Sequence, residues 1–501
     1  MKPGRFVAEN SSPPLPELGV GITYSSAIEP VLEQHPGLFD VVEFEPQTTW
    51  VETRDGEQPY RVSDLVLDHI AQLPGRKLVH SIGAPVGGTV RPQAVQLALL
   101  RRMIARFNAP WASEHLSFNR TQEFSTGFFL PPRQTPKGVE TVTTSIRDLQ
   151  EALPVPIAVE TGVNYLRPRP DEMPDGAFVG AVANSADCGI LLDLHNVFAN
   201  GVNGRQPVDD FLAQLPLDRV WEIHLAGGFE LEGFWLDAHS GAIPDPLLEI
   251  ARRVVPVLPN LKAIIFEIFP SFVPGFGLDG IRAEIEKLHE LWDLRGGTRG
   301  DRLRVQRQRQ VDFVADDHMS PAAWESALGA LVIGRPPADE ASHQLAADQG
   351  VAVVNRLARE FRASMIVSVL RLTSRLMMLA LGPDIFRSLL EDFWSKTPPQ
   401  LFASSEAEAF AAYLETLDLR VPQLAKVLEF ERAVLATLMD DQPRIIAFEF
   451  DPLPLLRGLA EGRLTEETGQ FGRFEIEVTG GGLLNASGLG MESIQQVVPY
   501  H

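Results

Sequence analysis

Histidines and carboxylates at the ends of short apolar segments are the residues of this sequence best suited to chemistry. His80 lies in KLVHS, Glu160 ends PIAVE and His224 lies in WEIHL. LDAHS adds Asp237 and His239, which are two residues apart and would point the same way if that segment is extended. The full candidate set is His80, His115, Glu160, Asp193, His224, Asp237, His239 and Glu267.

These side chains together predict a multinuclear metal site. Imidazole and carboxylate ligands without a thiolate favour iron, manganese or zinc, and the four carboxylates of the set can offset more than one divalent charge. Burying so many ionisable groups together without a cation would cost much free energy, so a metal is the simplest explanation.

Residues next to this set supply further candidates. Glu114 and His115 are adjacent and point to opposite faces of a strand, so only one of them can reach the site directly, and we favour His115. The other neighbours, to which we assign supporting or substrate contacts, are Glu43, Glu45, His195 and Asn196.

A scaffold must bring these segment ends together. Short runs rich in Val and Ile alternate with longer helix-like segments, which is typical of repeated β–α units and a parallel sheet. Eight such runs over about 280 residues fit a (β/α)8 TIM-like barrel, whose functional groups lie where strands end. An open doubly wound sheet is the alternative. The predicted strands are residues 19–22, 41–45, 77–81, 111–118, 156–160, 189–194, 220–225 and 263–269.

The character of the chain changes after the predicted barrel, which covers residues 15–295. Residues 296–318 begin with GGTRGDRLRVQRQRQ, which is rich in Gly and Arg and has no apolar period, so we expect a linker. Residues 319–501 are predicted to form a mainly helical domain that ends in a small α+β unit. Its predicted helices are 321–333, 344–362, 363–381, 384–396, 406–417 and 421–438, and its predicted strands are 444–450 and 473–478.

Composition limits the partners and the compartment. The formal charge of -22 at pH 7 disfavours nucleic acid and anionic membrane surfaces. Cys188 is the only cysteine, and the N-terminal segment lacks the apolar core of a signal peptide, so we expect a cytoplasmic protein. The most apolar stretch, 365–381, contains Arg371 and Arg375 and is short for a membrane span, so we expect a buried amphipathic helix.

The motifs resemble those of the multinuclear non-haem iron-dependent oxidases, barrel enzymes that modify ribosomally made peptides. SEHLSF, LLDLHNVFANGVNG, IHLAGG and LDAHS follow the family's order within residues 18–294. The resemblance implies iron ligands at the eight residues of the candidate set, and it adds Asn196 as a candidate metal ligand, at a position where the family carries Asn or His. It also implies two or three iron ions in a mixed-valent Fe(II)/Fe(III) state, with O2 as co-substrate.

The family commonly works with a separate partner protein that binds the leader of the precursor peptide. LEFERAVLATL and RIIAFEFDPLPLLRGLAEG, within residues 319–501, are similar to such a partner fused in the same chain. We therefore expect an oxidase that modifies a residue of a precursor peptide bound through this region. The alternative for the region is a helical domain that stabilises a homodimer or covers the barrel.

Two other functions fit the same residues. A divalent-metal barrel of the sugar-isomerase or endonuclease-IV-like kind uses similar ligands at strand ends and needs no O2, although the acidic charge argues against DNA repair. A non-catalytic scaffold that binds peptides through residues 319–501 would hold no metal. Oxygen consumption separates the first alternative from an oxidase, and metal content separates the second.

Overall fold

Eight parallel strands form the centre of the larger part of the molecule. The computed structural model describes residues 14–296 apart from 54, 55 and 57, residues 319–464 apart from 441, and residues 471–479 and 484–486. The strands are β1 (Gly19–Thr23), β2 (Val41–Phe44), β5 (Arg76–Ser81), β6 (Ala112–His115), β9 (Ile157–Glu160), β10 (Gly189–Asp193), β11 (Val220–Ala226) and β14 (Ala263–Glu267). They close a barrel in the order β1-β14-β11-β10-β9-β6-β5-β2, which confirms the predicted fold class.

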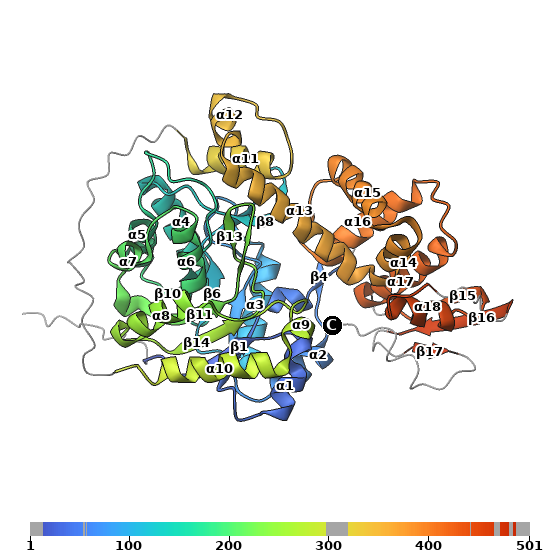
Figure 1. Cartoon of the computed structure of the whole chain (residues 1–501), viewed down its shortest axis with the longest axis horizontal. Coiled ribbons are helices and arrows are strands. Elements are labelled where there is room, and N and C mark those ends of the chain that lie inside the picture. Colours follow the sequence, from blue (N-terminus) through green and yellow to red (C-terminus); the bar gives the residue numbers. More distant parts are fainter. Residues whose placement is uncertain are drawn as a thin grey trace, which may run out of the picture.

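Helices cover the outside of this barrel (Figure 1). They are α1 (Glu29–Gln34), α2 (Asp64–Gln72), α3 (Ala94–Phe107), α4 (Pro136–Ala152), α5 (Asp175–Ala186), α6 (Leu194–Val202), α7 (Val208–Leu212), α8 (Asp245–Val254), α9 (Val273–Phe276) and α10 (Leu278–Trp292). Short 3-10 helices are η1 (Ser26–Ile28), η2 (Pro46–Thr49), η3 (Leu217–Arg219) and η4 (Val255–Val257). A two-stranded hairpin follows each of β2, β6 and β11. The first pairs β3 (Val51–Glu52) with β4 (Tyr60–Arg61), the second pairs β7 (Phe118–Arg120) with β8 (Ser125–Leu130), and the third pairs β12 (Phe229–Leu231) with β13 (Phe234–Leu236). They therefore stand at the mouth of the barrel, where the strands end.

Side chains fill the inside of the barrel in layers, because alternate residues of each strand point inward. The layer nearest the strand starts is mainly apolar and includes Leu18, Val41, Leu78, Trp111, Ala158, Leu191, Ala263 and Ile265. Two residues further along several strands, the inward position carries a candidate ligand. The pairs are Leu78 and His80, Ala158 and Glu160, and Leu191 and Asp193. The strand period thus sets the candidate ligands on an apolar floor.

The C-terminal region is mainly helical and ends in a three-stranded antiparallel sheet of order β15-β16-β17. Its elements are α11 (Pro321–Val332), α12 (Glu340–Ala346), α13 (Gln349–Val369), α14 (Arg371–Leu381), α15 (Pro383–Lys396), α16 (Ala403–Glu415), α17 (Leu424–Asp440), β15 (Arg444–Phe450), α18 (Leu453–Ala460), β16 (Phe471–Val478) and β17 (Leu484–Ala486). This confirms the predicted helical character. Of the predicted linker, residues 297–318 lie outside the described residues, so the domain boundaries stay a prediction.

The predicted helix boundary between residues 362 and 363 is wrong. α13 continues to Val369, and the chain bends by 108° before α14 begins. Glu431 of α17 explains the break, because its carboxylate accepts two backbone N–H groups in the first turn of α14. The stretch 365–381 is therefore two helices and not one. No single helix among the described residues has the length and apolarity to cross a bilayer, and α13 and α14 meet that test only as a bent pair.

The helical region packs on the mouth side of the barrel (Figure 1). Phe402 is 8% exposed and belongs to the hydrophobic core of the barrel. Its ring centroid lies 6.4 Å from that of Trp50 and 5.1 Å from that of Tyr60. Trp324 of α11 is fully buried and donates its indole N–H to the carbonyl of Pro131 at 2.9 Å. The C-terminal region is thus joined to the barrel by shared apolar contacts.

Candidate metal centre

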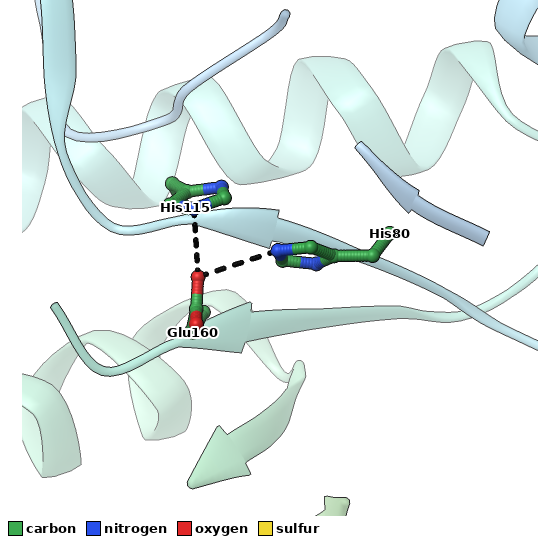
Figure 2. A group of neighbouring side chains, drawn as sticks. All are labelled: His80, His115 and Glu160. Atoms are coloured by element: carbon green, nitrogen blue, oxygen red, sulfur yellow. Dashed lines mark ion pairs between the residues drawn. The ribbon is translucent and has the colours of Figure 1, made fainter. Parts of the chain in front are cut away.

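Three adjacent strands bring one group of candidate ligands together. Figure 2 shows His80 from β5, His115 from β6 and Glu160 from β9 pointing toward one another. Glu160 Oε2 lies 3.0 Å from His115 Nε2 and 3.5 Å from His80 Nε2. The other ring nitrogens are held elsewhere, His80 Nδ1 by Ser113 Oγ at 2.8 Å and His115 Nδ1 by the carbonyl of Ser81 at 3.3 Å. Both imidazoles therefore present Nε2 to the same point.

A second group shares Glu160 with the first. Glu160, Asp193, His224 and Glu267 each offer one ligand atom within 4.8 Å of the others. His224 Nδ1 lies 3.1 Å from Glu267 Oε1 and 3.7 Å from Glu160 Oε1. Glu160 therefore presents Oε2 toward the first group and Oε1 toward the second.

Asp237 and His239 lie beside the second group. His239 Nε2 is 2.9 Å from Asp237 Oδ1 and 3.5 Å from Glu267 Oε2. The segment is not extended at His239, which has φ 45° and follows the end of β13, so the condition under which the two side chains would point the same way is not met. The side chains converge through this left-handed turn, a conformation that is uncommon outside glycine.

Asn196 supports Asp193 in the structure. Asp193 is the N-cap of α6, so its Oδ1 accepts the N–H of Asn196 at 2.8 Å. The Asn196 side chain donates through Nδ2 to Asp193 Oδ2 at 2.9 Å and to the carbonyl of Thr161 at 3.3 Å. Its buried Oδ1 has no hydrogen-bond partner among the described residues. Asn196 thus lies next to the candidate ligands, and its Oδ1 accepts no hydrogen bond from the described residues.

Two buried glutamates lie below His224. His224 Nε2 is 3.0 Å from Glu43 Oε2 and 3.7 Å from Glu222 Oε1, while Trp111 donates its indole N–H to Glu222 Oε2 at 3.0 Å. A carboxylate at Nε2 orients the ring so that Nδ1 faces Glu160 and Glu267. Sequence analysis missed Glu222, although WEIH places it two residues before His224 on the same face of a strand.

His195 orients Asp237. Its Nε2 accepts the indole N–H of Trp235 at 3.1 Å, so Nδ1 carries the proton and donates to Asp237 Oδ1 at 3.1 Å. The expected supporting role of His195 matches this contact. Glu114 lies outside the groups above, where it accepts hydrogen bonds from Ser81 Oγ at 2.6 Å and from the N–H of Ala84 at 2.8 Å.

Aromatic rings and one further carboxylate border the mouth. Phe129 stacks on His115 with ring centroids 4.2 Å apart, and Phe269 lies tilted against His239 at 4.5 Å. Glu45 lies within electrostatic range of Glu267, and its pKa is raised to about 7 by burial and by that neighbouring charge. The opening is therefore part apolar and part acidic.

Electrostatics couples these groups strongly. Burial alone would raise the pKa of Glu160, but the imidazoles of His115 and His80 hold it well below its usual range. Burial lowers the pKa of His80 to about 4. For His239, burial acts to lower the pKa, but the carboxylates of Asp237 and Glu267 outweigh it and raise the pKa to about 10. Without a cation, protons on the imidazoles must balance the carboxylates.

The buried polar atoms of the centre fit a metal. Within the part of the chain that the structure describes, several of them have no hydrogen-bond partner of acceptable geometry, although buried polar groups rarely lack one. These atoms are Glu160 Oε2, His224 Nδ1, His239 Nε2 and Glu267 Oε2. They are nitrogen and carboxylate donors that converge on shared points, as a cation requires.

The barrel matches a known protein family. A family model described as RiPP precursor modification enzyme MbnB/TglH/ChrH matches residues 19–276. The chain belongs to this family. A UPF0276 protein of Chromobacterium violaceum is 32% identical over 225 residues, which are 44% of this chain and 80% of the relative. A UPF0276 protein of Streptomyces avermitilis is 30% identical over 284 residues, 54% of this chain and 55% of the relative.

The family match confirms the resemblance found in the motifs, and with it an enzyme family that modifies ribosomally synthesised precursor peptides. Among solved structures, a xylose isomerase domain protein from Planctomyces limnophilus is 12% identical to this chain. It aligns with 56% of this chain and 98% of its own length at a TM-score of 0.36. At that level the likeness bears on neither the substrate nor the reaction.

Proposed function

We propose that this protein is a multinuclear iron-dependent oxidase that uses O2 to modify one residue of a ribosomally made precursor peptide. The observation that carries the proposal is the position of Glu160, which belongs to two groups of potential ligands at once. A bridging carboxylate with imidazoles on both sides and no thiolate suits two neighbouring iron ions. Membership in a family that modifies precursor peptides supports the peptide as substrate.

Each ligand group has a defined place in this proposal. One ion would be held by His80, His115 and Glu160, a second by Glu160, Asp193, His224 and Glu267, and a third subsite would use Asp237 and His239 beside Glu267. Bound iron would supply the redox chemistry that activates O2, which none of the ligand side chains can supply alone.

Residues around the candidate ligands orient their side chains and border them with aromatic rings. Glu43 lies 3.0 Å from His224 Nε2 and would favour a proton there, which leaves Nδ1 free to bind, and His195 holds Asp237 through a hydrogen bond to Oδ1. Phe129 and Phe269 place rings against His115 and His239 and reduce the contact of the mouth with water. A peptide side chain that reaches the ligands would contact these rings.

The C-terminal region belongs to the same proposal as the part that binds the precursor peptide. Its helices pack on the loops at the mouth, through Phe402 and Trp324, so a peptide held there has a short path to the ligands. The single cysteine and the acidic composition support a cytoplasmic location, which cell fractionation would check.

Elemental analysis of anaerobically purified protein tests the metal. We expect at least two iron ions per chain, and loss of iron in His80→Ala. The matched control is His69→Ala, because His69 is an exposed histidine on α2 whose partner is Glu29. Less than one iron per chain together with full zinc occupancy would overturn the proposal.

Coexpression with a short peptide encoded beside the gene tests the reaction. Mass spectrometry of that peptide should show a mass change that needs both O2 and the intact centre, and therefore disappears in Glu160→Gln. Turnover of a sugar without O2, with the peptide unchanged, would contradict an oxidase and support the isomerase-like alternative.

A further inference from the structure

A cavity of about 420 Å³ lies between the barrel mouth and the C-terminal helices. One wall comes from the segments after β2 and β5 and from β7, and the other from α13, α14, α17 and the start of α16. None of the eight candidate ligands lines it, so it is separate from the metal centre. Its size lies within the range of cavities that enclose a small ligand.

The lining combines aromatic rings with positive charge. Trp50, Phe361 and Phe402 contribute rings, and Phe361 is 46% exposed although it is large and apolar. Arg120 and Arg371 contribute guanidinium groups from the two opposite walls. Apolar surface beside a cation favours a ligand that has an apolar part and an anionic part.

Neither arginine forms a close ion pair among the described residues. The Arg120 side chain donates to the carbonyl of Gly83 and to Asn119 Oδ1, and Glu114 is the carboxylate within its electrostatic range. The Arg371 side chain lies within electrostatic range of Glu431. Glu431 also lines the cavity, but its two oxygens accept the N–H groups of the first turn of α14. Two guanidinium groups without a close ion pair, lining one cavity in a protein of net charge -22, favour an anionic ligand.

The cavity also lies close to the metal centre. Gln47 is part of its lining and donates to Ser81 Oγ at 2.9 Å, while the carbonyl of Ser81 receives His115 Nδ1 at 3.3 Å. Ser81 Oγ in turn donates to Glu114 at 2.6 Å. Gln47 and Ser81 therefore form a hydrogen-bonded path from the cavity lining to His115.

We propose that this cavity binds a short segment of the precursor peptide in which an apolar side chain stands next to Asp or Glu. The segment is distinct from the residue that is modified, because the metal ligands do not reach the cavity. The inference rests on the proposed function in taking a peptide as the occupant. The acidic side chain contacts Arg120 and Arg371, and the apolar one contacts Trp50, Phe361 and Phe402.

Two synthetic peptides test this site on the full-length protein as purified. The acidic probe is acetyl-Gly-Leu-Glu-Phe-Gly-amide, and its neutral counterpart carries Gln in place of Glu. Binding is measured by saturation-transfer NMR. We expect the acidic probe to bind at least about tenfold more tightly, because it alone forms charge-assisted hydrogen bonds with the guanidinium groups.

Variants locate the binding. R120Q and R371Q should each weaken binding of the acidic probe about tenfold, and Ser368→Trp should block it by filling the cavity. R387Q is the matched control, because Arg387 is an exposed arginine of α15 that does not line the cavity. Equal binding of the two probes, no binding of the acidic probe at millimolar concentration, or wild-type affinity in both R120Q and R371Q would overturn the inference.

Protection of arginines in the unmutated protein provides a second measurement that needs no variant to fold. The acidic probe should slow the modification of Arg120 and Arg371 by phenylglyoxal and leave Arg387 unaffected, and equal rates with and without the probe would overturn the inference. Iron content is measured on the same samples. Normal iron without probe binding refutes the cavity alone, whereas probe binding with less than one iron per chain refutes the proposed function.

Discussion

Glu160→Gln is the substitution that tests the metal centre most directly. The carboxylate lies 3.0 Å from His115, 3.5 Å from His80 and 3.7 Å from His224, and it is the only residue common to the two ligand groups that contain them. Gln has nearly the same shape, but it lacks the charge and one of the two acceptor oxygens. Both groups therefore lose their shared anion, whereas His80→Ala removes a ligand from one group only.

The size of the effect follows from linkage between metal binding and folding. A cation present at 100 times its Kd stabilises the folded state by about 2.7 kcal/mol, so two cations contribute about 5 kcal/mol. At about 2–4 °C per kcal/mol for a domain of this size, full loading raises Tm by about 10–20 °C. We expect this metal-dependent increment to vanish in Glu160→Gln and about half of it to remain in His80→Ala.

Calorimetry with and without a chelator measures the increment, and elemental analysis of the same samples counts the ions. The matched control is Glu230→Gln, because Glu230 is an exposed carboxylate on β12, outside the ligand groups. If Glu160→Gln keeps the metal content and the Tm increment of the unmutated protein, the bridging role of Glu160 is refuted.

Four further predictions concern the surroundings of the centre and the contact between the C-terminal region and the barrel. Glu43→Gln should weaken metal affinity about 10–100-fold without unfolding the protein, as measured by competition with a chelator, because Glu43 orients His224. Metal affinity should rise with pH up to about 10, with proton release seen by calorimetry in two buffers, because the raised pKa of His239 keeps it protonated in the metal-free protein. That protonation stabilises the metal-free protein fully below about pH 6.5 and the stabilisation is lost as pH approaches 10, which urea unfolding would show. Phe402→Ala should lower the free energy of unfolding by about 3–5 kcal/mol in the same assay, and a change below 1 kcal/mol would refute its place in the shared core.

The sequence predicted the barrel and the convergence of the candidate ligands for a common physical reason. Parallel strands end at one face, and the strand period of two makes Leu191 part of the apolar floor and Asp193 part of the mouth. The same period pointed to Glu222, which we missed because His224 alone was selected from WEIH. Whether each candidate binds metal stays a prediction.

Features set by long-range contacts could not be predicted from the sequence. The helix break at Leu370 depends on Glu431, and no local signal in the apolar stretch shows which residue caps the second helix. The left-handed backbone conformation of His239, with φ 45°, is likewise uncommon for residues other than glycine, so the sequence does not indicate it. The cavity needs walls from segments that are more than 200 residues apart in the chain, such as those of Arg120 and Arg371.

The apolar floor of the barrel has a consequence for the order of events. Leu78, Trp111 and Leu191 are fully buried and fill the barrel on the side away from the mouth, so we expect access to the candidate ligands from the mouth. Cations, O2 and peptide must then share a single entrance. A peptide seated in that entrance stands between the ions and bulk water, so the centre has to be loaded before its substrate arrives, and a seated peptide slows any exchange of the ions.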